Sequence, residues 1–256
     1  MTFQPDNKIN MDNNLKDFQP SDGYLQDRVI LITGASRGIG KAVALECARL
    51  GATILLVAKD LKRLEHTYDE ILALNAPQPA ILNIDLEVAN ANDYQAIADS
   101  IDKEYGHLDG LLHNAGRVGG LTPLQNIEID TWSKLITLHL HAPFLMSRAC
   151  IPLLRNSQDP SILFTIDEAN KAYWGAYGVS KYGQVGLLKI LADELDGDKK
   201  IRVNGIHPGI VRTDLRTHNY PGINPDEFPS PDTVTAPFIY FLGPDGKNTT
   251  SEIYKI

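Results

Sequence analysis

Short apolar runs alternate with amphipathic segments along most of the chain. The apolar runs, bounded by turn-forming residues, predict strands at Val29–Thr33, Thr53–Ala58, Ala80–Ile84, Gly110–His113, Ser161–Thr165, Ile201–Ile206 and, as an edge strand, Glu252–Ile256. Apolar residues at helical spacing predict helices at Ile39–Leu50, Leu61–Leu74, Tyr94–Tyr105, Trp132–Leu154, Tyr177–Leu195 and Thr233–Leu242. This alternation predicts an α/β protein of three layers, in which one parallel seven-stranded sheet has helices on both faces.

Length and composition favour one globular domain. The chain has 256 residues, of which 43% are apolar, so it can bury a full core. We expect a single domain over residues 25–256, preceded by a flexible tail over residues 1–24, because the first residues are rich in Asn, Asp and Gln. Met1 and Met11 are both candidate start residues.

Charge and cysteine usage exclude some classes of protein. The formal net charge of −8 argues against a nucleic-acid-binding surface, and no apolar stretch is long enough to form a signal peptide or to span a membrane. Cys47 and Cys150 fall in helical patterns and not in a metal-like cluster. We therefore expect reduced, buried thiols in a cytoplasmic protein that has no metal site and no membrane or nucleic-acid partner.

A glycine-rich turn follows the first predicted strand. Residues 33–40 read TGASRGIG and open the first predicted helix. Such a turn lets the backbone approach a pyrophosphate, and the N–H groups at the helix N-terminus then hold the anion. A glycine-rich string alone is weak support, but its place between a buried strand and a helix is the context that strengthens it.

Four further motifs follow in order: NIDL at residues 83–86, HNAG at 113–116, YGVSK at 177–181 and RVNGIHPG at 202–209. Together with the glycine turn they resemble the short-chain dehydrogenase/reductase family over about residues 25–256, and certain strings are similar to an uncharacterised bacterial branch of it. The resemblance implies a Rossmann fold with a doubly wound sheet and a bound nicotinamide dinucleotide. It assigns the coenzyme to Gly34, Ser36, Arg37, Gly38, Ile39, Gly40, Lys59, Asp85, Leu86, Asn114, Ala115, Gly116, Tyr177, Lys181, Pro208, Gly209, Ile210 and Thr213.

The end of the second predicted strand bears on the choice of coenzyme. An acidic residue there usually binds the ribose 2′-hydroxyl of NAD, whereas this chain has Lys59 first and Arg37 in the glycine turn. Two cations match the charge of a 2′-phosphate, so NADP is favoured over NAD. Asp60 follows directly and argues the other way, and Lys59 taken alone is also consistent with an exposed lysine at a strand end.

Tyr177 and Lys181 are four residues apart, so they share one helix face. Tyrosine normally titrates near pH 10, and a nearby ammonium lowers that value towards a useful acid or base. By the resemblance, Tyr177 exchanges a proton with the substrate oxygen, while Lys181 holds the nicotinamide ribose and tunes Tyr177. The alternative for an isolated match is an ordinary surface Tyr–Lys pair.

Two residues of the family's catalytic set are replaced. The family's serine is missing before Tyr177, and alignment of the preceding strand places Asp167 at its position. An ionised aspartate cannot donate to an oxyanion, although a protonated one in a dry pocket can. Thr165 is a possible substitute if the register has slipped, and otherwise an ordinary strand residue.

The second replacement is His139, which stands where the family has a helix asparagine that holds a relay water. His139 is either a relay group or a buried histidine satisfied by backbone. Pro143 follows it and is expected to break one backbone hydrogen bond and kink the long helix.

These features support a working NADP-dependent carbonyl reductase or alcohol dehydrogenase, or a degenerate member that binds dinucleotide with weak or no turnover. An epimerase or dehydratase is disfavoured by the glycine spacing and the short C-terminal part.

Tyr173, Trp174 and the loop Tyr220–Pro231 are expected to line the substrate pocket. This loop is either a lid or a plain surface loop. Gly183 and Gly186 indicate close packing, against the sheet or, by the resemblance, in a homodimer or homotetramer.

Overall fold

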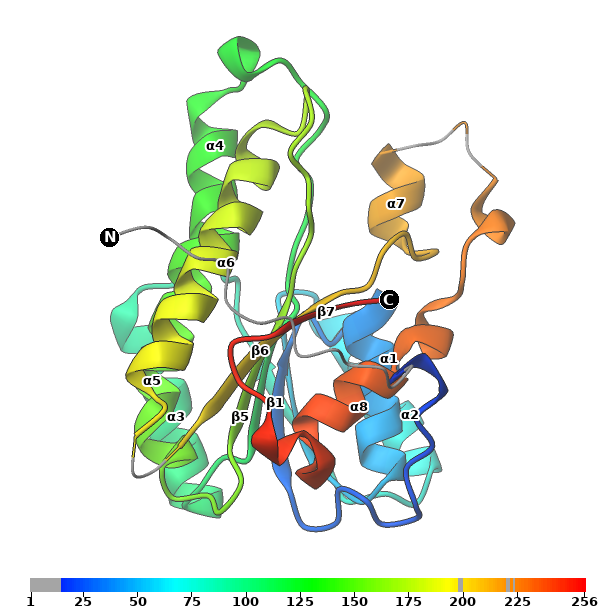
Figure 1. Cartoon of the computed structure of the whole chain (residues 1–256), viewed down its shortest axis with the longest axis vertical. Coiled ribbons are helices and arrows are strands. Elements are labelled where there is room, and N and C mark those ends of the chain that lie inside the picture. The colour runs from blue at the N-terminus through cyan, green and yellow to red at the C-terminus, as the bar shows by residue number, and fades with distance from the viewer. Residues whose placement is uncertain (1–14, 198–199, 220–221, 223) are drawn as a thin grey trace.

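The computed structural model describes residues 15–197, 200–219, 222 and 224–256. In this part of the chain seven parallel strands form one sheet in the order β3-β2-β1-β4-β5-β6-β7, which confirms the predicted architecture (Figure 1). The strands are β1 Val29–Thr33, β2 Thr53–Ala58, β3 Ala80–Asn83, β4 Gly110–His113, β5 Ser161–Thr165, β6 Arg202–His207 and β7 Ile253–Lys255. The order reverses between β1 and β4, which is where open α/β sheets bind ligands.

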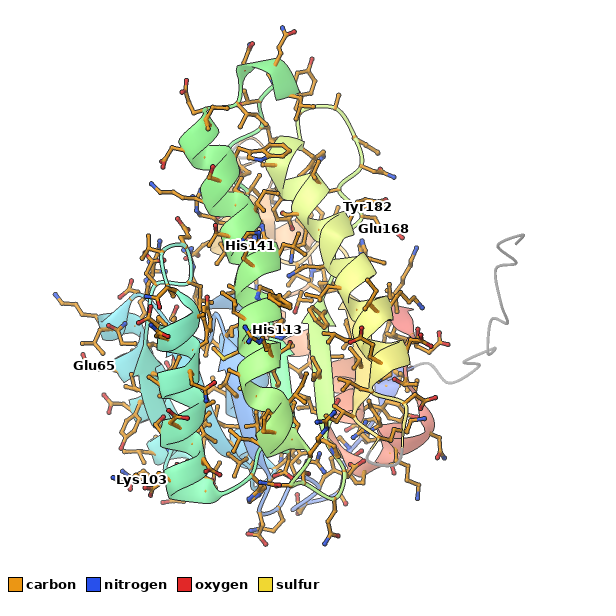
Figure 2. All side chains as sticks on the ribbon, turned by 90° about the vertical axis from the view of Figure 1, so that its left-hand side faces the viewer. Glu65, Lys103, His113, His141, Glu168 and Tyr182 are labelled. Atoms are coloured by element: carbon orange, nitrogen blue, oxygen red, sulfur yellow. The ribbon has the colours of Figure 1, made fainter. Side chains whose placement is uncertain are left out.

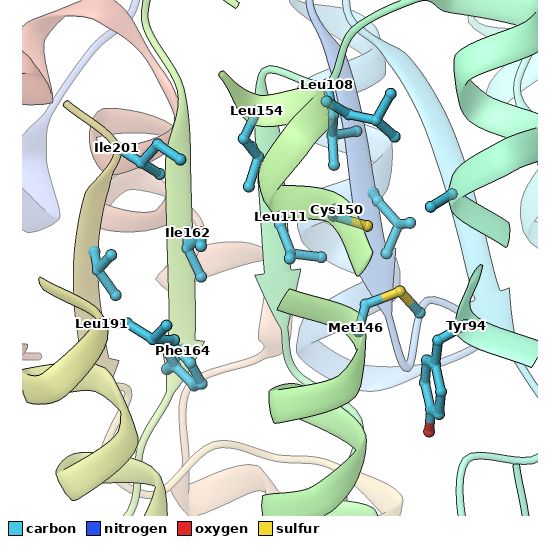
Figure 3. Close-up of a cluster of buried hydrophobic side chains, with 14 of the residues drawn as sticks. Tyr94, Leu108, Leu111, Met146, Cys150, Leu154, Ile162, Phe164, Leu191 and Ile201 are labelled. Carbon is cyan, nitrogen blue, oxygen red and sulfur yellow. The ribbon is translucent and has the colours of Figure 1, made fainter. Parts of the chain in front are cut away.

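Most strand residues are apolar because both faces of the sheet are covered. In β1, Val29 and Leu31 belong to one core cluster, whereas Ile30 and Ile32 belong to a second cluster on the opposite face. Successive side chains of a strand point to opposite faces, so each strand contributes to both clusters. Figure 3 shows the first cluster between the sheet and the helices, including Tyr94 and Phe164.

Helices form the two outer layers. Their bounds are α1 Gly38–Arg49, α2 Leu61–Ala73, α3 Ala91–Tyr105, α4 Ile129–Ile136, α5 Ala142–Leu154, α6 Gly175–Glu194, α7 Asp214–Asn219 and α8 Ala236–Leu242. Helices α1, α2 and α8 cover one face of the sheet, and α3, α5 and α6 cover the other (Figures 1 and 2). His113, labelled in Figure 2, is buried between these layers, with its Nε2 2.8 Å from Ser147 Oγ of α5. No helix within the described ranges is long and apolar enough to cross a membrane.

The long helix predicted over Trp132–Leu154 is interrupted. Helix α4 ends at Ile136, the next residues, Thr137–His141, form a π-helical turn, and α5 begins at Ala142. Pro143 is the second residue of α5, so the interruption predicted near this proline takes the form of a π turn immediately before it. A proline has no N–H for the helical hydrogen bond, and a π turn is a common way to accommodate a local break.

The predicted flexible tail over residues 1–24 is wrong for residues 15–24. Leu15 is 3% exposed, and the ring of Phe18 packs edge-on against the rings of Tyr24 and Tyr240, each 5.4 Å away. The polar composition of the segment concealed these spaced apolar side chains, which complete the core beside α8. The remainder of the predicted tail, with both candidate start residues, lies outside the described residues.

Candidate active site

One large cavity, of about 680 Å³, opens at the carboxyl ends of β1 to β6. The predicted coenzyme residues line it with the exception of Gly40, and so do Asp167, Tyr177 and Lys181 among the predicted catalytic residues. His139 does not line the cavity and lies behind it. The fold therefore brings motifs that are far apart in the sequence into one cavity.

The glycine turn between β1 and α1 is shaped by close backbone contacts. Gly34 has a φ of +71°, and a Cβ there would lie 2.8 Å from Ala115 Cα. A Cβ on Gly40 would lie 2.4 Å from both Gly34 O and Asn114 Nδ2, which explains why Gly40 supports the turn from behind. No side chain caps the N-terminus of α1 within the described residues, and its first turn has no acidic residue, so its amides are suited to an anion.

Asn114 joins three strand ends beneath the turn. Its backbone N–H donates to Thr33 Oγ1 at 2.9 Å, and its Nδ2 donates to Thr33 O at 3.2 Å. The Thr165 hydroxyl donates to Asn114 Oδ1 at 3.1 Å. Thr165 therefore has a structural partner, and its hydroxyl does not point to Tyr177 as a substitute for the family's serine.

Tyr177 lies on the cavity side of α6 and is almost fully buried. Its hydroxyl donates to Asp167 Oδ2 at 2.8 Å, and the ring packs against Trp174 and His139. Burial raises the pKa of Tyr177 well above its ordinary value, and the negative charge and hydrogen bond of Asp167 raise that pKa further. In this arrangement Tyr177 is a protonated phenol that donates to the aspartate.

Lys181 reaches the same point from one turn further along α6. Its Nζ donates to Thr165 O at 2.8 Å and lies 5.9 Å from the centre of the Tyr177 ring. Burial lowers the pKa of Lys181 to about 8, although the charge of Asp167 acts in the opposite direction. The predicted Tyr–Lys pair therefore lies inside the cavity and is not a surface pair.

The ring of His139 has a protein partner at both nitrogens. The Arg117 N–H donates to His139 Nε2 at 3.2 Å, so Nδ1 carries the proton and faces Ser180 Oγ at 2.9 Å. The Ser180 hydroxyl in turn donates to Tyr177 O at 2.8 Å. The relay of water predicted for His139 is not supported by this geometry, because neither ring nitrogen is free. The contacts fit a residue that positions Tyr177.

Sequence reasoning missed His207, which ends β6 and lines the cavity. The Gly209 N–H donates to His207 Nδ1 at 3.0 Å, so Nε2 carries the proton of the neutral ring. This Nε2 lies 3.7 Å from Asp167 Oδ1. Asp167 thus lies between a histidine N–H and the Tyr177 hydroxyl. The position of His207 beside the Pro208–Gly209 turn was the available signal in the sequence.

Basic side chains gather at the end of the cavity beside β2 and α2, where the family resemblance leads us to expect the adenosine of the coenzyme. Arg37 and Lys59 are there as predicted, and Arg63 of α2, which the sequence analysis missed, joins them. Lys59 Nζ lies 3.7 Å from Asp85 Oδ2 and 3.5 Å from Glu87 Oε1.

Asp60, which argued for NAD in the sequence, has a structural role. It is the N-cap residue of α2, and its Oδ1 accepts a hydrogen bond from the Arg63 N–H at 3.2 Å. A carboxylate at a helix N-terminus satisfies backbone donors and the helix dipole. The other oxygen of Asp60, Oδ2, lies 3.4 Å from Arg63 Nε, and Asp60 lines the cavity beside Lys59.

The residues predicted to line the substrate side of the cavity agree only in part with those that line it in the structure. Trp174 lines the cavity, but Tyr173 is 58% exposed and does not. The described residues of the loop Tyr220–Pro231 do not line the cavity either, and residues 220, 221 and 223 lie outside the described residues. Leu215 and Asn219 of α7, a helix that the sequence analysis did not predict, take this place.

The strand order, the glycine turn and the Tyr–Lys pair together define a Rossmann protein with a dinucleotide-type cavity. The sequence model of the short chain dehydrogenase family matches residues 28–223, and the chain belongs to this family of oxidoreductases. The uncharacterised oxidoreductase YciK of Escherichia coli K12 is 34% identical over 236 residues, which cover 91% of this chain and 93% of YciK.

Solved structures show the same likeness. A short chain dehydrogenase from Pseudomonas syringae is 39% identical, with a TM-score of 0.91, and the match covers 93% of this chain and 98% of that one. A short chain dehydrogenase from Shigella flexneri 2a, determined in complex with NADP, is 32% identical with a TM-score of 0.89, and the match covers 92% and 99% of the two chains.

Proposed function

We propose that this protein is an NADP(H)-dependent oxidoreductase that transfers a hydride between nicotinamide and a carbonyl or alcohol substrate. The observation that carries the proposal is the buried pair of Tyr177 and Lys181 in the same cavity as the glycine turn. A phenol beside an ammonium is a suitable proton donor for a substrate oxygen. The NADP complex of the Shigella flexneri relative supports the choice of coenzyme.

The residues at both ends of the cavity fit the coenzyme. The turn at Gly34 leaves backbone amides of α1 free of side-chain caps, and a pyrophosphate is the anion such a turn suits. Arg37, Lys59 and Arg63 supply the positive charge that a 2′-phosphate needs. Asp85, Asn114, Pro208–Val211 and Thr213 line the space between these ends.

When bound, the coenzyme supplies the hydride that reduces a carbonyl carbon. Tyr177 then donates its hydroxyl proton to the developing alkoxide oxygen. The Lys181 ammonium, 5.9 Å from the ring centre, stabilises the tyrosinate that remains. In the direction of oxidation, the deprotonated Tyr177 accepts the alcohol proton, and the negative charge of Asp167 opposes this deprotonated form because it raises the pKa of Tyr177.

The geometry also supports a second candidate, a degenerate member that binds dinucleotide and turns over slowly or not at all. Asp167 takes the position of a serine that would donate to the substrate oxygen, and an ionised carboxylate only accepts hydrogen bonds. The hydroxyl of Tyr177 is directed at Asp167, so a substrate carbonyl must compete with a charged acceptor for the same proton. Loss of one oxyanion donor costs about 10²–10³ in rate.

Calorimetric titration with NADPH and NADH tests the proposal first. We expect NADPH to bind about tenfold tighter than NADH, because charged hydrogen bonds to a 2′-phosphate contribute about 1.5–3 kcal/mol before the cost of breaking existing ion pairs. Arg37→Ala is expected to remove most of this preference. Arg148→Ala, at an exposed position of α5 outside the cavity, is the control. Absence of binding by either coenzyme would refute the proposed function.

Turnover is then followed as NADPH oxidation with a panel of aldehydes and ketones. Coenzyme-dependent reduction supports the working enzyme. Tight binding of NADPH without any turnover in either direction supports the degenerate member.

We further propose that α6 packs against a second copy of this chain in a homodimer or homotetramer. Val179, Tyr182 and Ile190 are about half exposed along one face of α6, and Tyr182 is labelled in Figure 2. Gly186 lies between them with open space beyond its Cα, whereas Gly183 contacts Leu140 of the same chain. Exposed apolar residues around a glycine suit a close helix contact between subunits.

Light scattering after size exclusion checks the assembly. The wild-type protein is expected to have at least twice the mass of one chain, and Ile190→Glu is expected to give a monomer because it places a charge in the contact. Leu74→Glu changes an equally apolar, exposed residue in the opposite layer and is expected to leave the assembly intact. A monomeric wild-type protein would contradict the proposal.

A cytoplasmic location is also proposed. Cys47 and Cys150 are both free and buried, and burial raises the pKa of the Cys150 thiol to about 12. Unpaired thiols are typical of a reducing compartment.

A further inference from the structure

Asp214 holds two arginines at the adenosine end of the cavity. Arg37 Nη1 and Arg63 Nη1 each donate to Asp214 Oδ2 at 3.1 Å. The three residues come from the turn after β1, from α2 and from the first position of α7, and all of them line the cavity. One carboxylate oxygen therefore lies at the point where two guanidinium groups converge.

The basic groups at this end of the cavity are held in ion pairs with carboxylates. Arg37 pairs with Asp214, and Arg63 pairs with both Asp214 and Asp60, whose Oδ2 lies 3.4 Å from Arg63 Nε. Lys59 lines the same end of the cavity and pairs with Asp85 and Glu87. A phosphate dianion offers three oxygens to such donors, whereas Asp214 offers them a single one. The arginine side chains are about half exposed and that of Asp214 is 60% exposed, so these ion pairs can be exchanged at a small cost.

We propose that Asp214 occupies the position of the coenzyme 2′-phosphate, so that a coenzyme carrying this phosphate must displace Asp214 from Arg37 and Arg63. The inference rests on the proposed function, because it assumes that NADP binds in this cavity. Asp214 is then a specificity-determining residue that lowers the affinity for NADP(H) and leaves the affinity for NAD(H) unaffected.

Displacement of Asp214 from the two arginines would also couple the coenzyme end of the cavity to the end that contains Tyr177. Asp214 begins α7, and Leu215, the next residue of this helix, packs against the cluster of Val118, Ala169 and Tyr177. Release of Asp214 removes the ion pairs that hold the start of α7 to the coenzyme end. The 2′-phosphate is thereby linked to a helix that packs against the cluster containing Tyr177.

The test measures dissociation constants of NADPH and NADH for wild-type protein and for Asp214→Asn. We expect Asp214→Asn to bind NADPH about three- to tenfold tighter, the size expected when exposed ion pairs no longer have to be broken, and to bind NADH with unchanged affinity. Asp226→Asn is the matched control, because it removes the same charge from an exposed ion pair with Arg212 that does not line the cavity. It is expected to change neither constant.

A second comparison distinguishes competition between Asp214 and the 2′-phosphate for the two arginines from simple electrostatic repulsion between Asp214 and the phosphate. In an Arg37→Ala, Arg63→Ala background, Asp214→Asn is expected to change the NADPH affinity less than twofold, since Asp214 then has no arginine to hold. An equal gain in that background, an equal gain for NADH, or no gain in the single variant would each overturn the inference. Failure of the wild-type protein to bind either coenzyme would instead refute the proposed function itself.

Discussion

Tyr177→Phe is expected to lower NADPH-dependent carbonyl reduction by about 10²–10⁴-fold and to leave the affinity for NADPH nearly unchanged. The substitution removes only the hydroxyl, which is the atom that exchanges a proton with the substrate oxygen in the proposed mechanism. The ring remains packed against Trp174 and His139, so the fold and the cavity wall are retained. Steady-state rates with an active substrate from the panel, together with calorimetry of NADPH binding, measure the two effects separately.

The control for this experiment is Tyr182→Phe. Tyr182 lies on the same helix but is 47% exposed, so loss of its hydroxyl is expected to leave the rate and the coenzyme affinity unchanged. A Tyr177→Phe protein that keeps wild-type turnover would show that Tyr177 does not carry the proton. A variant that loses coenzyme binding as well would show that the hydroxyl supports the coenzyme and not the chemical step alone.

Asp167→Ser is expected to raise the rate of carbonyl reduction by about 10²–10³-fold. The serine hydroxyl can donate to the substrate oxygen, which an ionised aspartate cannot do, and the Tyr177 hydroxyl is released from its acceptor. The same change removes a negative charge that raises the pKa of Tyr177, so this pKa falls. Alcohol oxidation, which requires a proton acceptor, is therefore expected to reach its half-maximal rate at lower pH than in the wild-type protein.

Rate profiles against pH for wild-type protein, Asp167→Ser and Asp167→Asn check this expectation. Asp167→Asn removes the charge and retains the shape, so it should show the acid shift with a smaller gain in rate. Asp130→Ser, at an exposed position of α4, is the control for loss of one carboxylate. An unchanged rate and profile in Asp167→Ser would mean that Asp167 does not limit this site.

The coenzyme end of the site was largely predictable from the sequence because its signals are local. The glycine turn directly joins a buried strand to a helix, and its Gly34 adopts a φ of +71° that glycine favours. Lys59 directly follows β2, so its place at the carboxyl edge follows from the strand itself. Arg63 was missed because a basic residue in the first turn of a helix has no pattern that separates it from any exposed arginine.

The role of His139 could not be predicted from the local sequence. The sequence left open a relay group or a buried, satisfied histidine, and both fit its helical position. In the structure both ring nitrogens contact protein groups of Arg117 and Ser180, 22 and 41 positions away along the chain, and these contacts favour the satisfied histidine. The order of residues 15–24 was missed for a similar reason, since Phe18 is ordered by Tyr240 at the other end of the sequence.

The sequence by itself determined the alternation of strands and helices, the glycine turn and the shared helix face of Tyr177 and Lys181. These features depend on spacings of two to four residues, which strand and helix geometry convert directly into position. Only the tertiary structure decided that Asp214 holds Arg37, 177 positions away, and that His207 faces Asp167. Such contacts depend on strand order and helix packing, which bring distant segments together and leave no periodic pattern in the chain.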